Sequence, residues 1–142
     1  MHWRAQGDRG EMAAMAWYAA HGAFVFAPLG HSPHCDFIAA LDPALIRVQV
    51  KTTGVFRRER WELTTCTRGG NQSWNGLTKT LDAAGFDELF AVVAEGRQWR
   101  IPALEVDGRS GLRLGGPKWS HREVEPNPTF GWTPQPRTRP LH

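Results

Sequence analysis

The stretch IRVQVKTT, residues 46–53, predicts the central strand of the fold. Apolar and polar residues alternate along it, in the order Ile46, Arg47, Val48, Gln49, Val50 and Lys51. A period of two is typical of a β-strand that buries one of its faces. Gln49 and Lys51 therefore project the same way from one rigid element.

A second apolar segment, CDFIAAL at residues 35–41, precedes this strand. The turn-forming Asp-Pro pair at 42–43 separates the two segments, so we expect a β-hairpin. The hairpin would place Asp36 beside Gln49 and Lys51. A carboxylate, an amide oxygen and an ammonium group at one point indicate a site for a metal ion and a phosphate group.

An amphipathic helix is expected before the hairpin, through about residue 20, with Gly22 as its stop signal. Asp8 and Glu11 have the spacing of a capping box. The expected apolar stripe comprises Met12, Ala13, Met15, Ala16, Ala19 and Ala20. From the pattern alone, Glu11 is either a helix-capping residue or a carboxylate close to the metal.

Glu11 on a helix, then Asp36, then Gln49-Val50-Lys51 resembles the PD-(D/E)XK nuclease superfamily. The segment GDRGEMAAMAWYAAHGAFVFAP followed by VQVKT is similar to members that resemble Holliday-junction resolvases. It is closer still to group I intron homing endonucleases built on this core, some of which also carry glutamine at this position. The resemblance covers roughly residues 3–105.

The resemblance implies an α/β fold with a restriction-endonuclease-like core, in which helices flank a central mixed sheet of about four or five strands. It implies a metal-dependent endonuclease that hydrolyses duplex DNA at specific sites. Mg²⁺ is the expected cofactor, and Mn²⁺ is expected to substitute. Cleavage of branched DNA by a resolvase-like nuclease and a catalytically degenerate DNA-binding module are the alternatives. By analogy, the protein is expected to form a homodimer or homotetramer.

Each residue of the motif has an expected role. Asp36 would bind the metal through a hard anionic oxygen, joined by the Gln49 side-chain carbonyl and the Val50 backbone carbonyl. Lys51 would orient the attacking water and offset the charge that develops in the transition state. Glu11 would help to place the metal or its waters. Gln49 replaces the more usual acid, so metal affinity is expected to fall.

Basic and polar residues after the motif are candidates for contacts to DNA phosphates. They form two groups, in the stretch 55–60 and in the polar loop 68–76: Arg57, Arg58 and Arg60, and Arg68, Asn71, Gln72 and Ser73. A solvated basic turn is the alternative for the first group and an ordinary hairpin loop for the second. His31, His34 and Cys35 suggest a third possibility, a small zinc site, although their spacing matches no strong zinc pattern.

The remaining segments complete the expected fold. We expect a short buried strand at 23–28, a strand at 61–67, a short helix through Ala84, and a hairpin with strands near 88–94 and 97–101. Short extended pieces are expected within 111–124. A single domain would span residues 1–125, and the proline-rich residues 126–142 would form a C-terminal arm.

The bulk composition is that of an ordinary globular domain of 142 residues. No apolar run approaches the roughly 20 residues that a membrane-spanning helix needs, and the N-terminus lacks the apolar core of a signal peptide. Two cysteines are too few for a disulfide framework, which favours a reducing, cytoplasmic location. The net charge of +3, carried mainly by arginine, permits nucleic-acid binding.

Overall fold

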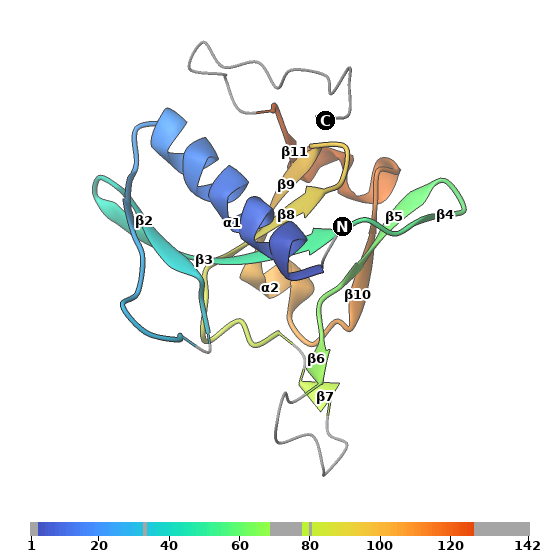
Figure 1. Ribbon diagram of the computed structural model, residues 1–142, viewed down its shortest axis with the longest axis horizontal. Coiled ribbons are helices and arrows are strands. Elements are labelled where there is room, and N and C mark those ends of the chain that lie inside the picture. Colours follow the sequence, from blue (N-terminus) through green and yellow to red (C-terminus); the bar gives the residue numbers. More distant parts are fainter. Residues whose placement is uncertain (1–2, 33, 69–77, 80, 127–142) are drawn as a thin grey trace, which may run out of the picture.

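A six-stranded mixed sheet forms the centre of the molecule (Figure 1). The computed structural model describes residues 3–32, 34–68, 78–79 and 81–126. The strands lie in the order β1-β2-β3-β8-β9-β11, with the bounds Phe24–Phe26, Phe37–Leu41, Ala44–Thr53, Glu88–Val93, Gln98–Pro102 and Glu123–Val124. Among these described strands, only β3 and β8 pair in parallel. The expected α/β class and mixed sheet are confirmed, with six strands instead of four or five.

The hairpin expected before residue 53 is present as β2 and β3. Its antiparallel ladder pairs Phe37 with Val48 and Leu41 with Ala44. Val48 and Val50 are buried, whereas Gln49 and Lys51 are half-buried. The alternation in the sequence therefore predicted both the strand and the direction of its side chains.

The helix α1, Trp3–Ala20, packs on one face of the sheet (Figure 1). Its buried side chains are Ala14, Trp17 and Tyr18, at the spacing i, i+3, i+4. The expected stripe was wrong in part, because Met12 is 68% exposed and Ala19 is exposed. The capping box was also wrong, because α1 begins at Trp3 and both Asp8 and Glu11 lie inside it. Gly22, with φ of +91°, follows the helix as expected.

A second layer packs on part of the opposite face of the sheet, over β8 and β9. It comprises a small sheet in the order β10-β5-β4 and two short helices, with the bounds Gly111–Leu114, Arg60–Thr64, Phe56–Arg57, Ala103–Val106 for α2 and Pro117–Arg122 for the 3₁₀ helix η2. The two faces of β8 supply both cores: Leu89 and Ala91 pack towards this layer, and Phe90 and Val92 pack towards α1. A strand buried on both faces explains the continuous apolar run in β8.

Three further expectations about the elements need correction. The strand β1 is an exposed edge, because Phe24 and Phe26 are 75% and 59% exposed. The segment before Ala84 contains β7, Thr78–Lys79, which pairs with β6, Thr67–Arg68, and residues 81–84 form no helix. Part of the extended piece expected after residue 116 is η2. The hairpin of β8 and β9 is confirmed, with Gly96 at φ of +97° in its turn.

Some expectations fall outside the described residues. They concern the loop residues Asn71, Gln72 and Ser73 and the C-terminal arm beyond Pro126. Among the described helices, none has the combination of length and apolar character that crossing a bilayer requires.

Candidate active site

Asp36 is fixed at the open end of the β2–β3 hairpin, one residue before β2. Its backbone N–H donates to the Val48 carbonyl at 2.7 Å, and its Oδ2 accepts the Val50 N–H at 2.6 Å. The ladder pair Phe37–Val48 places Asp36 opposite Gln49. The carboxylate therefore has a defined position, held by the backbone of the strand that carries the rest of the motif.

Gln49 and Lys51 lie on the face of β3 that is opposite α1. Their partners across the parallel ladder, Leu89 and Ala91, belong to the core on that side. The N–H and C=O of one strand residue point to the same edge of the strand. Because the Val50 N–H points to Asp36, the Val50 carbonyl points to that edge as well.

Glu11 reaches the hairpin from α1, where a glycine allows the helix to approach β3 closely. A Cβ on the buried Gly10 would overlap the Thr52 Cγ2 atom and lie 3.3 Å from Thr52 Cβ. The Glu11 carboxyl lies close enough to Asp36 for the two acids to interact electrostatically. The helix and the hairpin thus bring together two acids that are 25 positions apart in the sequence.

Asp36 opposes the ionisation of Glu11. Burial, followed by the charge of Asp36 and their hydrogen bond, raises the pKa of Glu11 to about 7. Burial also raises the pKa of Asp36, although the Val50 N–H, Glu11, Lys51 and His31 act to lower it. Burial lowers the pKa of Lys51, against the opposing effect of Asp36. A cluster of this kind is typical of a functional site.

The oxygen atoms at this position suit a hard divalent cation. Two neighbouring carboxyl groups provide a local negative charge when they ionise, which such a cation would neutralise. Backbone and amide carbonyls on β3 are the neutral ligands that Mg²⁺ and Ca²⁺ also accept. Gln49 and Val50 carry such oxygens, and the antiparallel pairing of β2 with β3 places this part of β3 beside Asp36. The residues present therefore fit a magnesium-type site.

The zinc site that was considered as a third possibility is not formed by the described residues. Within residues 3–32, 34–68, 78–79 and 81–126, no three side chains of His, Cys, Asp and Glu are grouped so that they could hold a metal. His34 packs against Gly85, since a Cβ there would lie 2.8 Å from His34 Cβ. Cys35 packs against the core beneath the second layer.

The arginines predicted to contact DNA lie on the small sheet and its neighbouring ribbon, not in the cluster. Arg57 is at the end of β4 and forms an ion pair with Glu62 at 3.7 Å. Arg58 occupies the following turn, with φ of 52°, and Arg60 begins β5. Arg68 ends β6, in the ribbon that projects from the body (Figure 1).

Two residues near the cluster were not assigned to it from the sequence. His31 lies close enough for its charge to lower the pKa of Asp36, and Cys66 acts on the pKa of Lys51. His31 precedes Asp36 in the same loop, which is a signal that the sequence offers. Cys66 follows β5, and no sequence pattern connects it with Lys51.

The chain matches a known nuclease family and its fold is similar to that of a solved nuclease. The model of the PD-(D/E)XK endonuclease family matches residues 1–126. The fold is similar to that of a bacterial homing endonuclease, I-Ssp6803I, with a TM-score of 0.71 and 20% identity, over 82% of this chain and 80% of that chain. Among curated proteins, none matches the chain. The chain therefore belongs to the PD-(D/E)XK endonuclease family.

Proposed function

We propose that this endonuclease is magnesium-dependent and cleaves duplex DNA at specific sites, in the manner of a homing endonuclease. The observation that carries the proposal is the meeting of Glu11 with Asp36 beside Lys51. Manganese is expected to substitute for magnesium, because it accepts the same oxygen ligands. The protein with the similar fold is a homing endonuclease, which favours site-specific cleavage over other nuclease activities.

The cation would be held by oxygen atoms from Asp36, from the Gln49 side chain and from the Val50 carbonyl, with Glu11 close by. When bound, it would polarise the phosphoryl oxygen and lower the pKa of an attacking water. Glu11 and Asp36 would both be ionised on metal binding. Gln49 supplies an oxygen without a charge, so the site carries one negative charge fewer than a site with glutamate there.

Lys51 would act on the phosphate and the water. Its ammonium group lies near Asp36 and is partly buried, so water screens its charge less than at the surface. It would orient the water in line with the scissile bond and stabilise the charge of the transition state. Arg57, Arg58, Arg60 and Arg68, with the loop residues Asn71, Gln72 and Ser73, remain our candidates for contacts to the DNA outside this centre.

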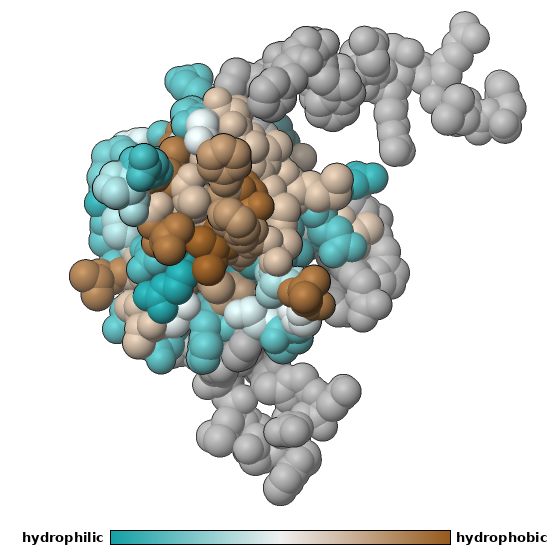
Figure 2. Space-filling view, turned by 90° about the vertical axis from the view of Figure 1, so that its left-hand side faces the viewer, coloured by the Kyte–Doolittle hydropathy of each residue, from teal (hydrophilic) through white to brown (hydrophobic). Residues whose placement is uncertain are grey.

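Cleavage of both strands requires two copies of the site, and one surface suits contact with a second copy. Phe24 and Leu45 are both paired with Ala40, one on each side of β2. All three side chains therefore lie on the same face of the sheet, opposite α1. Phe24, Phe26 and Leu45 are 75%, 59% and 69% exposed. Figure 2 shows a broad apolar area on the side of the molecule where β2 lies. We propose that a second copy covers this sheet face in a homodimer or homotetramer.

Incubation with a randomised-sequence DNA library and with a four-way junction tests the activity. We expect cleavage of selected duplexes in Mg²⁺ or Mn²⁺, and none in EDTA or with Lys51→Ala. Preference for the junction would identify a resolvase-like activity instead. Binding without cleavage of any substrate, in either metal, would show a degenerate module and contradict the proposal.

A further inference from the structure

A basic cavity lies in the second layer, among β5, β10 and η2. Its volume is about 400 Å³. Its lining includes four cationic side chains and a buried indole, from Arg60, Arg109, Arg113, Lys118 and Trp119. No carboxylate side chain is among the described residues that line it. The cavity therefore concentrates positive charge on one side of the molecule.

The arginine side chains of the cavity donate hydrogen bonds to backbone carbonyls and not to carboxylates. Arg60 and Arg109 donate to the backbone carbonyls of Glu59 and Glu105, at 2.8 and 3.1 Å. Arg113 approaches the carbonyls of Arg57 and Arg58 only at 3.4 Å. Within the part of the chain that the structure describes, these three arginines form no ion pair.

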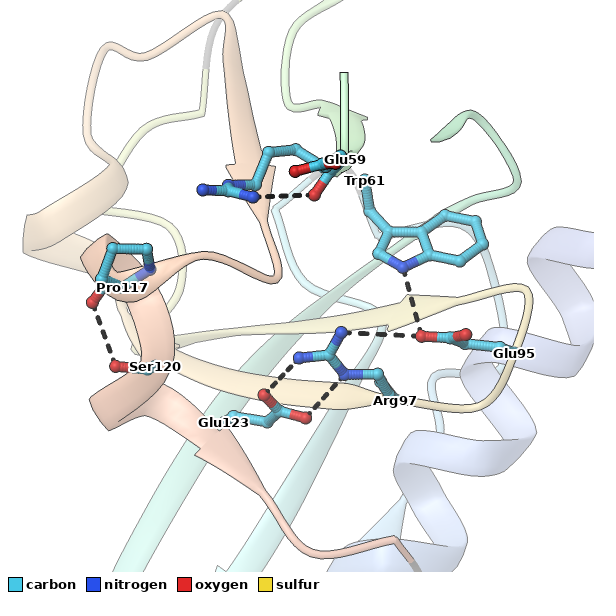
Figure 3. Close-up of polar contacts among 8 residues, drawn as sticks. Glu59, Trp61, Glu95, Arg97, Pro117, Ser120 and Glu123 are labelled. Atoms are coloured by element: carbon cyan, nitrogen blue, oxygen red, sulfur yellow. Dashed lines mark hydrogen bonds and ion pairs between the residues drawn. The ribbon is translucent and has the colours of Figure 1, made fainter. Parts of the chain in front are cut away.

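Three arginines on or next to the main sheet have acidic partners. Figure 3 shows Arg97 between Glu95 and Glu123, with ion pairs of 3.6 and 2.8 Å. Arg47 forms an ion pair of 3.1 Å with Asp87, just before β8, and Arg100 forms one of 2.7 Å with Glu88, in β8. The acid opposite Arg113 along the ladder is Glu62, and it pairs with Arg57.

Packing fixes the shape of the cavity. A Cβ on Gly116 would overlap the Arg60 guanidinium and lie 2.6 Å from its Cζ, so the side chain rests directly on the glycine backbone. Trp119 is 4% exposed, and Arg109 Cζ and Lys118 Nζ lie 5.5 and 5.7 Å from its ring centroid. These contacts hold the cations in place while their charged ends stay accessible.

The cavity is connected to the proposed active site through backbone contacts. Thr65 Oγ1 donates to the Arg109 carbonyl at 2.6 Å, and the Cys66 N–H donates to the Ser110 carbonyl at 3.3 Å. Cys66 in turn lies close enough to Lys51 to affect its pKa. Thr65 and Cys66, which follow β5, therefore lie between the backbone at Arg109 and Ser110 and the lysine of the motif.

We infer that the cavity binds a backbone phosphate of the DNA duplex, away from the scissile phosphate. Guanidinium groups match the geometry of phosphate oxygens, and cations without acidic partners offer the counter-ion release on which duplex binding depends. The inference deepens the proposed function and rests on it. It assigns a role to Arg109, Arg113 and Lys118, which the sequence did not suggest.

The test is the salt dependence of binding to a fluorescein-labelled duplex of mixed sequence, measured by anisotropy in EDTA so that cleavage plays no part. Arg109→Gln and Arg113→Gln should each lower the slope of log K against log salt concentration by about 1. Arg113→Lys should keep the slope, because a charge remains. Arg47→Gln is the matched control: it removes one positive charge that Asp87 already neutralises, so its slope should not change. Circular dichroism would show that each variant is folded.

The outcomes separate this inference from the proposed function. Unchanged slopes in both cavity variants, with wild-type protein that cleaves DNA, would overturn the phosphate site alone. Lowered slopes with no cleavage in Mg²⁺ or Mn²⁺ would support the phosphate site and contradict the nuclease proposal. A slope lowered equally by Arg47→Gln, or absence of binding by the wild type, would overturn the phosphate site.

Discussion

The carboxyl of Glu11 illustrates how a residue's role depends on its neighbour. In the sequence it had the spacing of a capping residue, but it lies in the interior of α1, where Asp36 is close enough to affect its pKa. Two acids placed together without a cation disfavour the folded state when both are ionised. We therefore expect the site to lower the stability of the metal-free protein at a pH where both acids are ionised.

Glu11→Gln should change how stability depends on pH in the metal-free protein. The pKa of Glu11 is about 7 in the folded state and 4.5 ordinarily, so the folded state binds more protons between these values. The free energy of unfolding should therefore fall as pH rises from about 4.5 to about 7. The variant should flatten this fall and gain about 1 kcal/mol above that range, since solvent screens part of the interaction.

Urea denaturation in EDTA, at about pH 5 and about pH 8, measures the effect. Asp8→Asn on the same helix is the control, since Asp8 is exposed. Equal pH dependence in the wild type and in Glu11→Gln would show that Asp36 does not oppose the ionisation of Glu11.

Lys51→Met should abolish cleavage while it preserves the fold. Methionine keeps the packing of the side chain, and removal of one transition-state charge typically costs about 10²- to 10³-fold in kcat. Gln49→Glu should retain cleavage, because the oxygen ligand remains, and should bind Mg²⁺ more tightly. Asp36→Ala should be inactive. Cleavage rates on a selected duplex and calorimetric Mg²⁺ titrations measure both effects; activity in purified Lys51→Met would remove Lys51 from the mechanism.

Among the elements, the contact of α1 with β3 determines where Glu11 lies. Gly10 faces Thr52 at a separation that leaves no room for a side chain. At Gly7, one turn earlier on the same helix, an added Cβ would have no described atom within 4 Å. Alanine substitutions at the two positions therefore distinguish two effects on stability: helix propensity alone at Gly7, and close packing as well at Gly10.

Gly10→Ala should destabilise the protein by about 1–3 kcal/mol through overpacking and should lower cleavage, because it displaces Glu11. Gly7→Ala should stabilise it by about 0.5–1 kcal/mol through helix propensity. Thr52→Ser removes the Cγ2 methyl, so the Gly10→Ala/Thr52→Ser double variant should recover most of the loss. Thermal denaturation of the wild type and these variants is the measurement, and a neutral Gly10→Ala would contradict the close approach.

At the scale of the whole molecule, the apolar sheet face of Phe24, Phe26 and Leu45 is the surface we assign to a second copy. Phe24→Asp/Leu45→Asp should convert the oligomer to a monomer, because two charges would be buried at the interface. Leu104→Asp is the control, since Leu104 is 84% exposed on α2, outside this face. Light scattering measures the mass; an unchanged oligomer, or a monomeric wild type, would contradict the assignment.

The sequence alone determined the elements whose signals are local. The period of two in β3 and the turn at Gly96 predicted the two hairpins, and the order of Asp36, Gln49 and Lys51 predicted the motif. These features depend on residues that are close in the chain, so their pattern is visible without the fold. The parallel pairing of β3 with β8 was not predicted, because a long crossover separates the two strands.

Only the tertiary structure decided the features that distant segments share. It buried Trp17 and Tyr18 where the sequence favoured Met12, because the sheet presented Phe37 and Phe90 to that side of the helix. It left β1 as an exposed edge, and it gathered cations from β5, β10 and η2 into one cavity. Periodicity fixes which side chains share a face, whereas burial and charge pairing depend on the partner that the fold places opposite that face.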